Sequence, residues 1–138
     1  VTSIGEGAFA DCSGLTGDLI IPEGVTSIGD YAFKNCTNLN YVDFSSFGRF
    51  KPRKLTDIRN MFNWCRYITS INMSMIDLST VDLFGYTWGN CKALTELYLN
   101  TEFKPTATMT TNMFANITSS GKIYYNSKYD VTQLANII

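Results

Sequence analysis

The residues best suited to metal or redox chemistry are four cysteines: Cys12, Cys36, Cys65 and Cys91. They lie 24, 29 and 26 residues apart, unlike the C-x2-C pairs that bind zinc. Each follows an aromatic residue by three positions, and Ile117 follows Phe114 in the same way. Because an apolar side chain takes the cysteine position there, we expect a reduced, buried ladder of thiols. Stacked repeats would place neighbouring Cα atoms about 5 Å apart, so disulfide bridging is the open alternative.

Acid–base chemistry has few candidate groups in this chain. Twelve carboxylates are spread along it, and there is no histidine. The commonest general base and the commonest metal ligand are therefore both missing. Two carboxylates could serve glycoside hydrolysis, but no spacing singles out a pair. We predict no catalytic residue, no metal site and no cofactor, with a carboxylate-dependent hydrolase as the remote alternative.

Charge and composition narrow the class of protein further. The formal net charge is -1, from 11 basic and 12 acidic residues, which argues against a nucleic-acid partner. Apolar residues make up 45% and aromatic residues 14%, typical of a folded, β-rich chain. No apolar run is long enough to span a bilayer, so we expect no membrane insertion within this segment.

The cysteines belong to a repeated unit that must position them. Residues 1–15 and 25–39 share nine of their fifteen positions, among them V-T-S-I-G, A-F, Cys and Leu. The later aromatic anchors, Phe62, Trp88 and Phe114, follow at steps of 29, 26 and 26 residues. These steps lie in the period of leucine-rich repeats, whose units bury their apolar faces by stacking.

Each unit also contains a short alternating segment that predicts a half-buried strand. The five segments are Leu19-Ile-Ile, Val42-Asp-Phe, Ile71-Asn-Met, Leu97-Tyr-Leu and Ile123-Tyr-Tyr. If these strands pair in parallel, their outward residues form one row: Ile20, Asp43, Asn72, Tyr98 and Tyr124. Aromatic and hydrogen-bonding groups on one surface are typical of recognition sites. We predict Asp43, Asn72, Tyr98 and Tyr124 as binding residues, against the alternative of a solvated sheet face that favours tyrosine.

One insertion is strongly basic. Arg49, Lys51, Arg53 and Lys54 surround Pro52, which predicts a surface loop rather than a strand. The alternatives are a partner contact through these four residues and a solvated loop between two repeat subtypes.

The end of the chain leaves the repeat. Asp130 and Gln133 resemble a capping box, and apolar residues follow at helical spacing up to Ile138. We expect a C-terminal helix over residues 130–138 that caps the last coil, as solenoids require for solubility.

Two motifs carry a family resemblance. V-T-S-I-G-x-x-A-F-x-x-C-x-x-L, with the linker I-I-P-E-G-V, resembles the BspA-like (Treponema pallidum type) leucine-rich repeat of bacterial surface proteins. Met61-Phe-Asn-Trp-Cys65, leading into Ile68-Thr-Ser-Ile-Asn-Met-Ser74, is similar to a related surface repeat. The resemblance implies a secreted or cell-surface location and an adhesive or ligand-binding role.

We therefore expect an α/β repeat fold: a short right-handed leucine-rich-repeat solenoid of about five β-rich coils. The chain begins inside a unit, so we expect residues 1–138 to be one domain at the C-terminal part of a longer array. The predicted function is a non-catalytic module that binds an unknown protein or glycan, and the alternative is a purely structural spacer. No oligomeric state is predicted.

Overall fold

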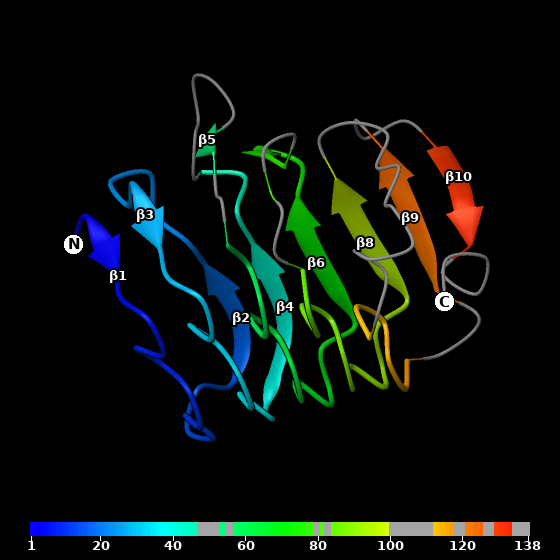
Figure 1. Cartoon of the computed structure of the whole chain (residues 1–138), viewed down its shortest axis with the longest axis horizontal. Helices are drawn as coiled ribbons and strands as arrows, with labels where there is room; N and C mark the ends of the chain where they lie inside the picture. Colours follow the sequence, from blue (N-terminus) through cyan, green and yellow to red (C-terminus); the bar gives the residue numbers. More distant parts are fainter. Residues whose placement is uncertain are drawn as a thin grey trace.

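A sheet with one strand from each alternating segment is the main element of the fold. The computed structural model describes residues 1–46, 53–54, 57–78, 81, 84–99, 112–117, 121–125 and 129–133. The strands of the main sheet are β2 (Gly17–Ile20), β4 (Leu39–Asp43), β6 (Ser70–Met73), β8 (Glu96–Leu99), β9 (Lys122–Tyr125) and β10 (Tyr129–Gln133). The first five pair in parallel in that order, and β10 pairs antiparallel with β9. Figure 1 shows them side by side, which confirms the predicted repeat solenoid.

Two pairs of short parallel strands lie outside the main sheet. They are β1 (Ser3–Ile4) with β3 (Ser27–Ile28), and β5 (Arg53–Lys54) with β7 (Ile76–Asp77). The first pair is formed by the two copies of V-T-S-I, so the duplicated phrase pairs with itself. Gly29 follows β3, and a Cβ at Gly29 would lie 2.5 Å from the backbone nitrogen of Glu6. The glycine therefore allows two successive coils to approach each other.

The aromatic residue of each unit lies at the centre of a turn with left-handed backbone on both sides. Two residues before and two residues after each ring, φ is positive, between 56° and 67°. The pairs are Gly7 and Asp11, Tyr31 and Asn35, Asn60 and Trp64, Tyr86 and Asn90, and Asn112 and Asn116. Seven of the ten are Gly, Asn or Asp, the residues that adopt this conformation most readily.

Backbone hydrogen bonds join each turn to the next. Tyr31 N–H donates to the carbonyl of Arg59 at 3.1 Å, and Asn35 N–H donates to the carbonyl of Asn63 at 2.7 Å. Between them, Phe33 N–H donates to the next coil in the same way. Since these N–H groups bond between coils rather than within a helical turn, the connections are turns. The described residues contain no helix, so the expected α/β class is narrowed to a β-solenoid.

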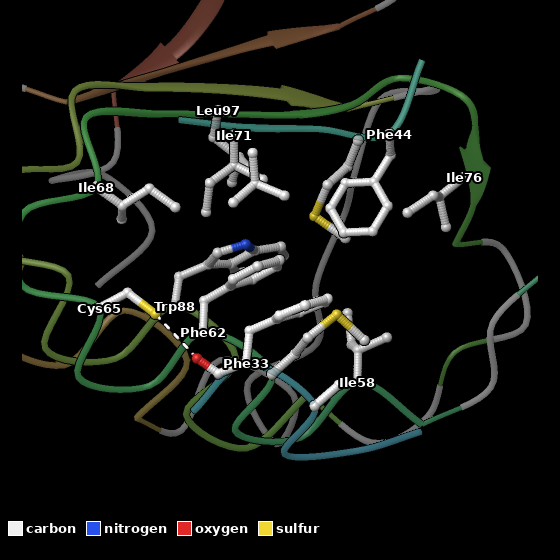
Figure 2. Packing of buried hydrophobic residues seen from close by; sticks show 14 of the residues in the cluster. Phe33, Phe44, Ile58, Phe62, Cys65, Ile68, Ile71, Ile76, Trp88 and Leu97 are labelled. Carbon is white, nitrogen blue, oxygen red and sulfur yellow. Dashed lines mark hydrogen bonds between the residues drawn. The ribbon is translucent and has the colours of Figure 1, made fainter. Parts of the chain in front are cut away.

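The core lies between the main sheet and this stack of turns. Phe9 stacks on Phe33, and Phe33 stacks on Phe62, with centroids 5.8 Å apart in both pairs. Trp88 stacks on Phe114 at 5.0 Å. Figure 2 shows the rings of Phe33, Phe62 and Trp88 layered beneath the aliphatic side chains of the sheet. Each of these coils thus adds one ring to an aromatic column, which comprises the stacks Phe9–Phe33–Phe62 and Trp88–Phe114.

The cysteines form the predicted ladder. All four are free thiols; Cys12 is half-buried, and Cys36, Cys65 and Cys91 are buried. The Sγ of Cys65 donates a hydrogen bond to the carbonyl of Phe33 in the preceding coil at 3.2 Å (Figure 2). Cys36 and Cys91 make the equivalent bond at 3.0 Å. The thiols therefore fill the core and each supplies a weak donor to a neighbouring carbonyl.

We predict that this ladder makes the fold sensitive to alkaline pH. Burial raises the pKa of Cys36 to about 11 and that of Cys65 to about 12, and it raises the pKa of Cys91 in the same direction. The folded chain therefore holds protons that the unfolded chain releases above about pH 9. The free energy of unfolding should fall from that pH upwards, because the unfolded state then binds fewer protons. Urea unfolding between about pH 8 and pH 11 measures this, and Cys65→Ala should give a shallower decline.

The expected C-terminal helix is wrong at its first turn. Residues Tyr129–Gln133 form β10, with Tyr129 opposite Tyr125 and Gln133 opposite Lys122. Two influences compete here: the capping-box pattern favours a helix, whereas the free edge of β9 offers unpaired backbone groups. Val131 and Thr132 are β-branched and fit a strand. The rest of the predicted helix, residues 134–138, lies outside the described residues.

Candidate binding face

The outward residues of the main sheet form two rows that run across its strands. In one row, Ile20 lies opposite Asp43, Asp43 opposite Asn72, Asn72 opposite Tyr98, and Tyr98 opposite Tyr124. The four residues predicted to bind a partner are therefore neighbours on successive strands. Their sequence neighbours Val42, Ile71 and Leu97 are fully buried, so the alternation of each strand directs this row to the outer face.

A second row lies two residues earlier in each strand, and sequence reasoning missed it. Its members, in register, are Asp18, Tyr41, Ser70, Glu96 and Lys122. The same period-two alternation could have identified them, since residues i and i+2 share a face of a strand. The outer face therefore holds a third tyrosine, Tyr41, and a further carboxylate beside the predicted pair of tyrosines.

Tyr98 and Tyr124 form the aromatic part of this face. Their rings stack with centroids 5.0 Å apart and planes 18° from parallel. Tyr98 Oη donates a hydrogen bond to Glu96 Oε2 at 2.8 Å. Partial burial and this hydrogen bond to a carboxylate raise the pKa of Tyr98 to about 12. Tyr98 is therefore a neutral phenol with a fixed ring, and its orientation is set by two neighbours.

Asp43 and Asn72 have structural partners of their own. Asp43 Oδ1 accepts from the backbone N–H of Ser45 at 2.7 Å, and Asn72 Oδ1 accepts from the backbone N–H of Ser74 at 3.1 Å. Each side chain thus closes the turn after its strand. Partial burial and the charge of Asp43 raise the pKa of Tyr41, while a hydrogen bond from Asn72 lowers it. The two polar residues hold the edge of the face and orient Tyr41.

Most of the basic segment, including Arg49 and Lys51, lies outside the described residues. Arg53 and Lys54 form β5, which pairs in parallel with β7. The prediction of a loop was wrong for these two residues, because the backbone of the following coil offers a strand edge beside them.

Other kinds of site have no counterpart in the described ranges. Among those residues, no three His, Cys, Asp or Glu side chains lie close enough together to hold a metal ion. The same residues include no helix with the length and apolar character needed to cross a membrane.

Stacked coils, a parallel sheet with a polar and aromatic outer face, and an aromatic column define a leucine-rich-repeat solenoid. The chain belongs to the BspA-type leucine-rich repeat family. The family model, described as a BspA type leucine rich repeat region of six copies, matches residues 2–136. No curated protein and no solved structure matches the chain. The match confirms the resemblance to the BspA-like repeat carried by the V-T-S-I-G motif.

Proposed function

We propose that this chain is a non-catalytic adhesion-type module that binds a protein or a glycan through the outer face of its main sheet. Repeats of this family are typical of bacterial surface and secreted proteins, and we propose the same location here. The residues that make contact with the partner are Tyr98 and Tyr124, and Tyr41 lies on the same face two strands from Tyr98.

The observation that carries this proposal is the stacked pair of tyrosines at the β8–β9 end of the polar outer face. Tyrosine gives a large, amphipathic contact area and loses little side-chain entropy on binding. The ring of Tyr98 is already held by Tyr124 and Glu96, so part of the ordering cost is met before a partner arrives. The carboxylate of Glu96 beside Tyr98 and that of Asp43 on the same face add hydrogen-bond acceptors.

Removing both tyrosines should abolish most of the binding. We expect the double variant Tyr98→Ala and Tyr124→Ala to weaken binding by about tenfold to a hundredfold, as loss of an aromatic contact pair usually does. Binding is measured by glycan array and by pull-down with the immobilised chain, followed by titration of any ligand found.

Two variants serve as controls for this experiment. Tyr98→Phe keeps the stacked ring and removes only the hydroxyl, so it should retain most of the affinity. Tyr67→Ala removes a tyrosine that is 62% exposed and lies outside the main sheet, so it should bind normally. Unchanged binding by the double alanine variant would remove the sheet face from the proposal.

The second candidate function is a structural spacer. It is favoured by the internal hydrogen bonds of Asp43 and Asn72, which show that part of the outer row stabilises turns. A spacer would bind no ligand in either assay, and its stability would rise as further repeats are added to the array.

A further inference from the structure

One turn differs from the others at the left-handed position after the aromatic ring. That position holds Asp11, Asn35, Asn90 and Asn116 in four turns. In the fifth turn it holds Trp64, with φ at 67°. Asn and Asp tolerate a left-handed backbone, whereas a bulky side chain rarely adopts it. Trp64 is also 36% exposed, so burial in the core does not account for its presence.

The tryptophan interrupts a ladder of side-chain amides. Asn35 Nδ2 donates to Asp11 Oδ1 at 2.8 Å, and Asn116 Nδ2 donates to Asn90 Oδ1 at 2.9 Å. An asparagine in place of Trp64 would continue this pattern to Asn35. Instead, Asn90 Nδ2 donates to Asn63 at 2.9 Å, and within the described part of the chain no protein donor is paired with Asn35 Oδ1.

A depression of about 350 Å³ opens at this interruption, at the lower end of the range for small-molecule sites. Its lining residues are Asp11, Lys34, Asn35, Trp64 and Arg66. The Arg66 guanidinium lies over the Trp64 ring at 5.1 Å, and Lys34 Nζ lies 5.5 Å from the centre of the Tyr31 ring. Neither cation forms an ion pair with any described residue.

We propose that this depression binds a sugar residue carrying an anionic group. The indole offers an apolar face for the C–H groups of a pyranose ring. The Asp11 carboxylate and the Asn35 carbonyl oxygen accept hydrogen bonds from sugar hydroxyls. Lys34 and Arg66 supply two positive charges against the single negative charge of Asp11, although the whole chain carries -1. The site therefore favours an acidic sugar over a neutral one.

This site is separate from the outer face of the main sheet, and the proposal does not rest on binding there. The variants of Tyr98 and Tyr124 leave the Trp64 depression unchanged, and variants of Trp64 leave the sheet unchanged. The two proposals can therefore fail independently.

Binding of defined sugars tests the proposal. The probes are sialyllactose and a glucuronic-acid oligosaccharide, which distinguish two kinds of carboxylate sugar, with a sulfated oligosaccharide as a third anion and lactose as the neutral control. The chain has two tryptophans, and Trp88 is fully buried, so a fluorescence change on titration reports mainly Trp64. We expect at least one acidic probe to bind about tenfold or more tightly than lactose, and added salt to weaken it.

The decisive variant is Trp64→Asn. It should lose the acidic sugar by about tenfold or more, as measured by isothermal titration calorimetry because the reporting indole is absent, while its thermal midpoint stays equal to or above that of the unmodified chain. The midpoint should not fall, because asparagine suits the left-handed position and restores the amide ladder. A purely structural tryptophan would give the opposite result, a lower midpoint. Arg66→Gln should weaken acidic probes and leave lactose unaffected.

The matched control is Tyr67→Ala, which removes an exposed aromatic residue of the same coil outside the depression and should bind normally. Three results would each overturn the proposal: lactose and the acidic probes bind equally well, Trp64→Asn retains binding, or no probe binds. If Trp64→Asn does not fold, Arg66→Gln decides, because its side chain is exposed and its loss leaves the core intact.

Discussion

Replacing Trp88 with alanine should destabilise the fold by about 3–5 kcal/mol, the usual cost of deleting a buried tryptophan. Trp88 is fully buried, stacks on Phe114 at 5.0 Å and contacts Phe84 with centroids 6.5 Å apart. It joins the ring of Phe84 to that of Phe114 in the next turn. The cavity left by alanine would interrupt this column. The surrounding residues should fill it only in part, because the sheet and the backbone hydrogen bonds between turns hold the neighbouring coils in place.

The informative partner variant is Trp88→Phe, which installs the ring found at the other anchors. Nε1 of Trp88 is buried and has no hydrogen-bond partner among the described residues. An unpaired buried donor costs about 1–3 kcal/mol, so its removal should offset much of the lost volume. We expect Trp88→Phe to lie within about 1 kcal/mol of the unmodified chain. Urea unfolding at constant m-value measures both variants, and a loss below about 1.5 kcal/mol for Trp88→Ala would refute the role assigned to the column.

The repeat and the strand row could be predicted from the sequence, because both depend on local periodicity. Alternation around Ile71 and Leu97 placed Asn72 and Tyr98 on the same face, and the parallel register of the sheet aligned them. The cysteine ladder followed from one substitution, Ile117 in the cysteine position. In each case the pattern within one repeat unit determines whether a side chain points into the core or out of it.

Features that depend on contact between coils could not be predicted in this way. β10 forms because β9 leaves an open edge for it to pair with. The local capping-box pattern at Asp130 and Gln133 favours a helix instead, and nothing else in the local sequence indicates a strand strongly enough to outweigh it. The depression at Trp64 needs the stacking of three successive turns, which brings Asp11, Asn35 and Trp64 together although they are far apart in sequence. The left-handed positions were visible only as a recurrence of Asn and Asp near each ring.

Replacing Asn90 with alanine should destabilise the fold by about 3 kcal/mol, through the backbone and the amide ladder together. Asn90 is 5% exposed and has φ at 59°. Its Nδ2 donates to Asn63 Oδ1, and its Oδ1 accepts from Asn116 Nδ2, both at 2.9 Å. Alanine leaves the buried acceptor of Asn63 unpaired, and a left-handed alanine adds about 1 kcal/mol or more.

Asn90→Gly separates these two contributions, because glycine adopts the left-handed backbone freely but still lacks the amide. We expect Asn90→Gly to destabilise the fold by about 1 kcal/mol less than Asn90→Ala. The rest of the destabilisation should remain, because the hydrogen bonds of the amide ladder are lost in both variants. Asn35→Ala is the matched control: it has the same backbone conformation, but its one ladder bond goes to exposed Asp11, so the loss should be about 1–2 kcal/mol. Chemical unfolding of all three gives the comparison. If Asn90→Gly and Asn90→Ala have equal free energies of unfolding, the left-handed position tolerates a side chain. If Asn90→Gly loses a negligible amount, the buried amides contribute nothing to holding successive coils together.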